Sequence, residues 1–297
     1  MSRRLRLSIR RKDRLSSLPD EALEHIISYL TTKDAVVTSF LSKRWKSQSL
    51  WRSQQNLHFD DKTFQDRFSF RQFMYSVITN RDNTLPILTF HLNCRRYSNT
   101  LPTVVLTIKT LSVLKLKRVT LNQDDPCFDL PSLKILHLET VSFTYHKHIR
   151  ELLSACPILE ELETKDLTVK THWSELPADR DVLSLSNLVR ANISGILLKL
   201  DWLHNVHHLR IKLWWTDCLP GMFNNLTHME LIFDIRCAYP SGLFKWEWLI
   251  KLLQNSPKLQ TIIINEVFTV HSYGDKEWKN PEIVPGCLLS HLTTCYM

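Results

Sequence analysis

The chain has 297 residues, of which 43% are hydrophobic and 10% aromatic, a composition typical of a folded globular protein rather than a disordered one. No run approaches the roughly 18 consecutive apolar residues of a membrane-spanning helix, and we expect no secretory signal. The seven cysteines are odd in number and never spaced C-x-x-C, which indicates free thiols in a reducing compartment, the nucleus or the cytoplasm.

The formal net charge of +8 is unevenly distributed. Seven basic residues and one acid lie within residues 1–14, which leaves only +2 for the other 283 residues. We therefore interpret residues 1–13 as a basic tail, either merely solvated or acting as a nuclear-import signal, a phosphate-seeking arm or an organellar presequence. The body of the chain lacks the basic face of a nucleic-acid-binding domain, so nucleic acid is not the expected partner.

A first helix is predicted to begin at Pro19, since proline tolerates the first helical position. Asp20 and Glu21 follow, where carboxylates favour the positive end of the helix dipole. Apolar residues recur at the spacing of one helical face; they are Leu23, Ile26, Ile27 and Leu30.

Two more short helices are predicted directly afterwards. Thr31 and Thr32 end the first helix and offer a side-chain cap for the second. The second helix carries an apolar stripe of Val36, Val37, Phe40 and Leu41, and Ser42 caps a third helix that carries Trp45. Three helices in fewer than about 50 residues cannot close a substantial core, so their apolar surface needs a partner inside or outside the chain.

The stretch DRLSSLPDEALEHIISYLTTKDAVVTSFLSKRW resembles the F-box of plant F-box/leucine-rich-repeat proteins. The resemblance implies an F-box over residues 14–60 that docks onto a Skp-type adaptor, which bridges to a cullin scaffold and a ubiquitin-charged enzyme. The adaptor contacts that it implies are Leu15, Leu18, Pro19, Ile26, Ile27, Val36, Val37, Leu41 and Trp45. The alternative is that these residues only pack a helical cap onto the rest of the chain.

The chain departs from the family pattern after Trp45, where the path to Leu50 and Trp51 is about two residues too long. At about 100° per residue, this shift rotates both side chains away from the face that Trp45 sets. The third helix is therefore expected to bend, end early or pack Trp51 elsewhere, with adaptor binding affected accordingly.

Segments of the form L-x-x-L-x-apolar recur along the rest of the chain at intervals of 18 to 33 residues, near the spacing of leucine-rich repeats. They start at Leu85, Leu111, Leu133, Leu159, Leu188, Val206, Leu226 and Leu259. We predict a helical linker over 61–84 and irregular repeats over 85–274. Each repeat strand should point its alternating apolar residues inward and the residues between them outward, onto a concave face that binds a target protein.

Further features support a solenoid. Two helix-like stretches end in Cys156-Pro157 and Ser256-Pro257 and resemble the convex-side helices of the plant family. Residues 278–290 are similar to the opening of the FBD domain, so we expect 275–297 to be a truncated FBD-like segment or a solenoid cap. The predicted fold is thus α/β, with an N-terminal three-helix F-box followed by an irregular leucine-rich-repeat solenoid that has a curved parallel sheet.

Other candidate sites carry less weight. His146, His148 and the His204/His207/His208 group suit zinc by spacing alone, but no Cys or carboxylate accompanies them in metal-site order. Trp214-Trp215 could form a docking hot spot, or lie half in the core. Five scattered glycines allow no phosphate loop, and no catalytic triad is evident from spacing. We therefore expect no enzyme activity, cofactor or metal.

The combined prediction is a substrate-recruiting subunit of a cullin–Skp–F-box ubiquitin ligase. The first alternative is an interaction scaffold whose F-box is too altered for ligase assembly. The second is nucleic-acid binding through the basic leader, which would be strongly salt-dependent.

Overall fold

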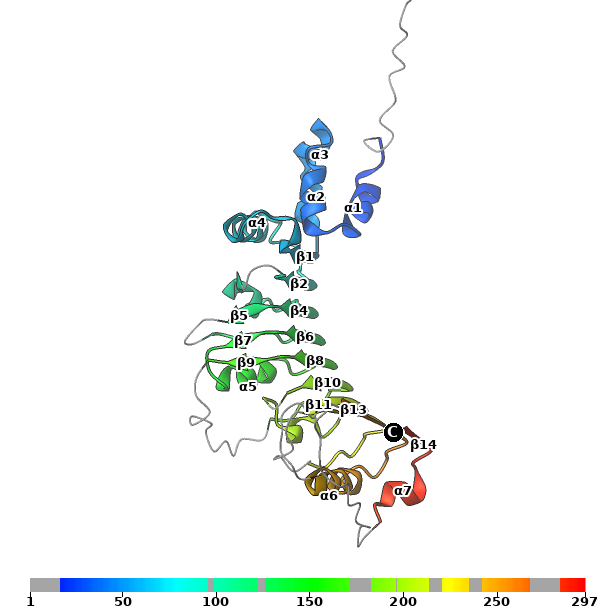
Figure 1. The fold of residues 1–297 in the computed structure, drawn as a ribbon. Coiled ribbons are helices and arrows are strands. Elements are labelled where there is room, and N and C mark those ends of the chain that lie inside the picture. The colour runs from blue at the N-terminus through cyan, green and yellow to red at the C-terminus, as the bar shows by residue number, and fades with distance from the viewer. Residues whose placement is uncertain are drawn as a thin grey trace, which may run out of the picture.

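The structure is a computed structural model that describes residues 17–95, 99–121, 126–170, 183–195, 197–213, 221–234, 242–267 and 284–296. A group of short helices at the N-terminus is followed by a curved stack of parallel strands (Figure 1). The N-terminal helices are α1 (Asp20–Ser28), α2 (Thr32–Thr38), α3 (Lys43–Gln48) and the 3-10 helix η1 (Leu50–Ser53). Within the described ranges, no helix is both long enough and apolar enough to cross a membrane.

Across the described ranges, ten strands form one sheet. Every neighbouring pair is parallel, and the strands follow one another in the order of the chain. In order they are β1 (Asn56–Asp60), β2 (Thr89–Asn93), β4 (Val113–Lys117), β6 (Ile135–Glu139), β8 (Glu161–Lys165), β10 (Arg190–Ser194), β11 (His208–Leu213), β12 (His228–Asp234), β13 (Thr261–Val267) and β14 (Thr294–Tyr296). Each of the eight predicted L-x-x-L segments leads into one of these strands, which confirms the repeat prediction.

Two strands of the sheet were not predicted. β1 lies inside the range assigned to the F-box and pairs with β2 in register from Asn56 to Asp60. β14 lies in the C-terminal segment and pairs with β13, so that segment adds a further strand to the sheet. The parallel stack therefore starts before the first predicted repeat, while the division into domains stays a prediction.

The sheet buries one face, because side chains alternate along each strand. In β4, Leu114 and Leu116 are buried, whereas Lys115 and Lys117 lie on the opposite side of the sheet. We call this side, which carries the outward side chains, the outer face. The same register places Leu136 beside Leu114 and Leu162 beside Leu136, so the buried side chains stack in continuous rows. Burying each such leucine contributes about 1.5–3 kcal/mol, and this row supplies the core that short strands could not build alone.

A second sheet lies beside the first. Its strands are β3 (Asn99–Thr100), β5 (Val119–Leu121), β7 (Ser142–Phe143) and β9 (Thr168–Val169), again parallel. One residue separates β4 from β5 and has a left-handed backbone, Arg118 with φ 55°. Thr140 and Asp166 take the same conformation directly after β6 and β8, with φ of 55° and 52°. These residues turn the chain from one sheet into the other.

Helices connect the strands on the side opposite the outer face of the ten-stranded sheet (Figure 1). They are α4 (Arg67–Asn80), α5 (Lys147–Ser154), α6 (Gly242–Gln254) and α7 (Gly286–Ser290), with short 3-10 helices η2 (Asp61–Thr63), η3 (Thr103–Thr107) and η5 (Leu200–Leu203). The two predicted helix–proline units are confirmed. Each helix ends before a buried small polar residue that donates to a carbonyl four residues back, Cys156 to Leu152 and Ser256 to Leu252.

Candidate protein-docking surfaces

The N-terminal helices enclose a small core of their own. It consists of Leu23, Ile27, Ala35, Trp45 and Leu50, all buried. Side-chain caps fix the helix starts, as the sequence predicts, because Thr31 Oγ1 accepts from the Asp34 N–H at 3.2 Å and Ser42 Oγ accepts from the Trp45 N–H at 3.4 Å. An ion pair between Arg44 and Asp20 links α3 to the start of α1.

The structure places the predicted adaptor contacts in different environments. Ile27 and Trp45 are only 1% and 3% exposed, so in this chain they hold the helices together. Leu18 and Val36 are half-buried, and Leu15 lies outside the described residues. The predicted contacts that reach the surface are Pro19, Ile26, Val37 and Leu41.

Two aromatic residues that were absent from the predicted contacts are the most exposed apolar side chains of this region. Tyr29 is 77% and Phe40 81% exposed. Phe40 lay on the predicted stripe, but α2 ends at Thr38, so Phe40 follows the helix in a turn and projects outward. We call the exposed set the helical apolar surface; it comprises Ile26, Tyr29, Val37, Phe40 and Leu41.

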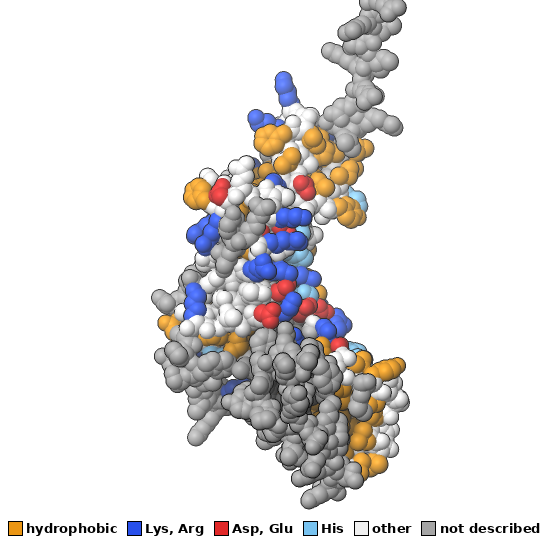
Figure 2. Space-filling model, viewed as in Figure 1, with side chains coloured by type: hydrophobic (Ala, Val, Ile, Leu, Met, Phe, Trp, Pro, Cys, Tyr) orange, Lys and Arg blue, Asp and Glu red, His pale blue; other side chains and the backbone are white. Residues whose placement is uncertain are grey.

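Figure 2 shows hydrophobic side chains gathered over the N-terminal helices, away from the charged side chains along the sheet. Five large apolar residues exposed within 16 positions are more than isolated surface residues explain. The helical apolar surface is therefore a candidate for binding another protein.

A single residue with a left-handed backbone accommodates the extra length of the chain after Trp45. Helix α3 ends at Gln48, and Ser49 takes a left-handed conformation with φ 45° and ψ 47°. A new 3-10 helix then turns Leu50 into the same small core as Trp45, while Trp51 packs against both this core and that of the strands. The third helix ends early, and the extra length leaves Leu50 and Trp51 packed inside the chain.

Hydrogen bonds tie the helices to the start of the sheet. Gln54 Nε2 donates to the Ile27 carbonyl at 3.0 Å, and the His58 N–H donates to Thr32 Oγ1 at 2.7 Å. The buried Arg81 guanidinium donates to the carbonyls of Gln54, Leu85 and Pro86 at 3.4, 3.0 and 3.2 Å. Burial lowers the pKa of Arg81. Because Gln54 joins both networks, it couples α1 to the segment leading into β2.

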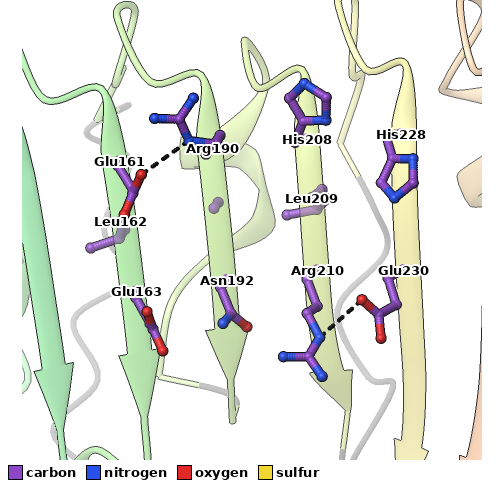
Figure 3. Close-up of a pocket in the computed structure, with 11 residues that line it drawn as sticks. Glu161, Leu162, Glu163, Arg190, Asn192, His208, Leu209, Arg210, His228 and Glu230 are labelled. Carbon is purple, nitrogen blue, oxygen red and sulfur yellow. Dashed lines mark hydrogen bonds and ion pairs between the residues drawn. The ribbon is translucent and has the colours of Figure 1, made fainter.

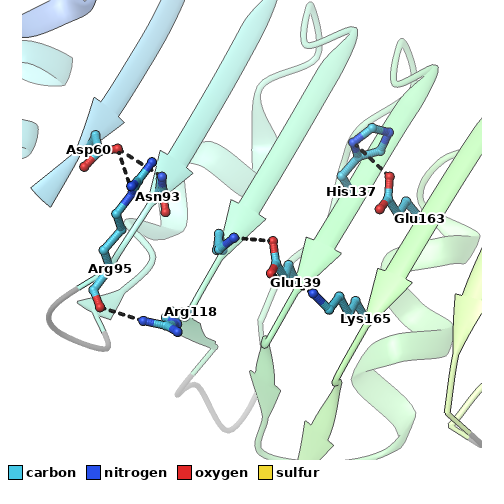
Figure 4. Close-up of polar contacts among 9 residues, drawn as sticks. Asp60, Asn93, Arg95, Arg118, His137, Glu139, Glu163 and Lys165 are labelled. Carbon is cyan, nitrogen blue, oxygen red and sulfur yellow. Dashed lines mark hydrogen bonds and ion pairs between the residues drawn. The ribbon is translucent and has the colours of Figure 1, made fainter. Parts of the chain in front are cut away.

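The outer face of the sheet is polar and lies on the hollowed side of the molecule (Figures 1 and 2). At its N-terminal end, Glu139 pairs with Lys117 at 2.6 Å and with Lys165 at 3.3 Å (Figure 4). Burial disfavours the charged form of Glu139, but hydrogen bonds from the two lysines outweigh it and lower its pKa. The three side chains come from β4, β6 and β8 and form a ladder across the strands.

A second polar cluster occupies β8, β10, β11 and β12 around a cavity of about 260 Å³ (Figure 3). Arg190 Nε pairs with Glu161 and Arg210 Nε with Glu230, both at 3.0 Å. His137 Nε2 lies 2.7 Å from Glu161, and this hydrogen bond, together with that from Arg190, lowers the pKa of Glu161 against the opposing effect of burial. Such polar rows on the open face of a sheet suit recognition of a protein surface.

The predicted histidine groups are dispersed. The His146 ring contacts the Leu197 carbonyl at 3.1 Å, and the buried His148 packs edge-on against Tyr145. His204 lies 3.5 Å from Ser184, while His208 faces His228 across neighbouring strands. In the part of the chain that the structure describes, no three His, Cys, Asp or Glu side chains are placed to hold a metal ion. Trp214-Trp215 lies outside that part.

Comparisons with known proteins agree with this architecture. A family model described as F-box domain matches residues 15–53, and one described as Leucine Rich Repeat matches residues 132–157. The chain is 30% identical to a putative FBD-associated F-box protein of Arabidopsis thaliana, over 94% of this chain and 84% of the relative. It is 29% identical to two F-box/FBD/LRR-repeat proteins of the same plant, over 95% and 94% of this chain and 79% and 84% of the relatives.

Proposed function

Because the chain belongs to the family of F-box/FBD/leucine-rich-repeat proteins, we propose that it is the substrate-recruiting subunit of a cullin–Skp–F-box ubiquitin ligase. Its helices bind a Skp-type adaptor, and the outer face of its sheet binds the target protein. The chain makes no bond itself. It raises the effective concentration of the target's lysines near the charged enzyme.

The observation that carries this proposal is the helical apolar surface. Phe40 and Leu41 are 81% and 63% exposed, although they lie in the segment that matches the F-box model. Burying such side chains against a partner is favourable by about 25 cal/mol for each Å² of apolar area. Ile27 and Trp45 contribute indirectly, by holding the helices that present this surface.

The junction between helices and sheet supports the recruiting role. A receptor positions its target only if the adaptor-binding part and the target-binding part are held together. Gln54 and Arg81 bond across this junction, and Trp51 packs into both cores.

The alternative of a scaffold with a degenerate F-box rested on the extra residues after Trp45. The packing of Leu50 and Trp51 weakens that alternative, because the insertion leaves the small helical core filled. The absence of a cullin from material captured through the adaptor would restore it.

Co-purification with a Skp-type adaptor and its cullin tests the proposal. We expect the wild-type chain to retain both proteins. We expect Leu18→Ala combined with Pro19→Ala, and separately Val37→Glu combined with Leu41→Glu, to release them. The matched control is Phe68→Glu, at a side chain of α4 that is 74% exposed and outside the F-box match.

Circular dichroism melting curves establish that each variant is folded. Adaptor capture that survives in the folded Val37→Glu and Leu41→Glu double variant would contradict docking through the helical apolar surface.

A further inference from the structure

A second cavity, of about 230 Å³, opens on the outer face of β1 to β8. The middle outward position of these five strands forms one row in register across the sheet. The row reads His58, His91, Lys115, His137 and Glu163, and all five side chains line the cavity.

The charged side chains that line the cavity are three lysines and two glutamates, so one positive charge is left over. Lys117 and Lys165 are both paired with Glu139, and Glu163 lies 3.6 Å from His137 Nδ1, as Figure 4 shows for His137 and Glu163. Lys115 forms no ion pair with any residue within the described ranges. Lys115 is half-buried and lines the cavity, where an opposite charge is attracted more strongly than in open solvent.

The neighbours of Lys115 on β2 add no charge to the cavity. His91 Nε2 and Asn93 Oδ1 are buried with no hydrogen-bond partner among the described residues. Burial, His58, Lys115 and His137 lower the pKa of His91 to about 4, so its ring is neutral and adds no second cation beside Lys115.

We propose that this cavity accepts the carboxylate of an aspartate or glutamate side chain of the target protein, with Lys115 as its ion-pair partner. This rests on the proposed function, because it names the chemistry that the target-binding face reads. One unpaired ammonium matches the single charge of a carboxylate. A phosphate carries about −1.5 to −2 and is typically held by several cations, often arginines.

Selection from a random peptide library on the full chain tests this assignment without any adaptor. We expect the enriched peptides to share an Asp or Glu and to lose that preference on Lys115→Glu. The control is Lys147→Glu, an exposed lysine in the first turn of α5 that changes the net charge equally and does not line the cavity. Equal enrichment of acidic peptides on both variants would overturn the site, since it would reflect net charge alone.

Affinity for a selected peptide gives the second measurement. Lys115→Met should weaken it by about tenfold or more, the loss expected for one charged hydrogen bond. Replacing the peptide's Asp by Asn should do the same, whereas phosphoserine in its place should bind no more tightly. Tighter binding of the phosphoserine peptide would overturn the carboxylate assignment. Because the adaptor is absent throughout, these results are independent of whether the chain joins a ligase.

Discussion

Burial separates two aromatic residues that lie five positions apart in the F-box segment. Trp45 is 3% exposed in the small helical core, and Phe40 is 81% exposed beyond the end of α2. The apolar pattern of the sequence could not distinguish them. Periodicity shows which apolar residues share one face of a helix, but not whether that face packs inside the chain or against another protein. The predicted adaptor contacts therefore included the internal Trp45 and left out the accessible Phe40.

Stability measurements should separate the two roles. Trp45→Ala should lower the free energy of unfolding by about 3–5 kcal/mol, because it empties the small core. Phe40→Ala should change it by less than about 0.5 kcal/mol, because the ring packs against little. Urea unfolding followed by circular dichroism checks both values. Equal destabilisation by the two substitutions would show that Phe40 is packed inside the chain.

The Glu161 carboxylate makes stability depend on pH in the acid range. Its pKa lies below the ordinary value of 4.5 because of hydrogen bonds from His137 and Arg190. It therefore stabilises the fold at pH above that ordinary value, and the contribution is lost as the pH falls through the lowered pKa. The side chain is 26% exposed, so we expect a contribution of at most about 1 kcal/mol. Glu161→Gln should reduce the decrease in the free energy of unfolding as the pH falls below 4.5, measured by urea unfolding at several pH values. An unchanged decrease would contradict this role.

At the scale of elements, the strands preceded by an L-x-x-L segment were predictable from the sequence, and the other strands were not. β1 has the sequence Asn56–Asp60, in which only Leu57 and Phe59 alternate and no leucine precedes them at repeat spacing. The strands of the second sheet have two or three residues, too few for a period of two to be recognised. Tertiary stacking, rather than local pattern, determines both.

The left-handed turn after β6 offers a test of how the two sheets are joined. A β-branched residue in this conformation costs about 1–2 kcal/mol, part of which glycine recovers despite its greater freedom when unfolded. Thr140→Gly should therefore raise the free energy of unfolding by about 0.5–1 kcal/mol. Thr89→Gly in the extended strand β2 should lower it by about as much. Denaturant titration of both variants checks the opposite signs, and destabilisation by Thr140→Gly would refute the strain.

At the scale of the whole molecule, contacts run mainly between neighbouring strands of the stack. A substitution in one repeat should therefore destabilise mainly that repeat and its neighbours. The outward side chains of the sheet show which contacts could not be predicted from the sequence alone. Lys115 and His91 lie 24 positions apart in the chain, and only the register of β2 with β4 brings them together. The face was predictable from alternation, whereas the partners on it required the structure.

The junction at Arg81 provides the corresponding prediction. Arg81→Met removes donors to three carbonyls and should cost about 2–4 kcal/mol of local stability. Hydrogen exchange should accelerate in α1 to η1 and in the segment around Leu85, while the protection of β6 to β12 is unchanged. Arg71→Met, on the exposed side of α4, is the control. Uniform acceleration throughout the sheet would show instead that the molecule unfolds as one unit.

The unbroken register from β1 to β14 lets the outer face change independently of the core. Each outward position of one strand is geometrically equivalent to the same position of the next, since the backbone repeats without a shift. An outward residue can therefore be exchanged by a single mutation without disturbing the buried rows beneath it. The charge pattern of the outer face can in this way change one position at a time, while the buried rows and the N-terminal helices remain unchanged.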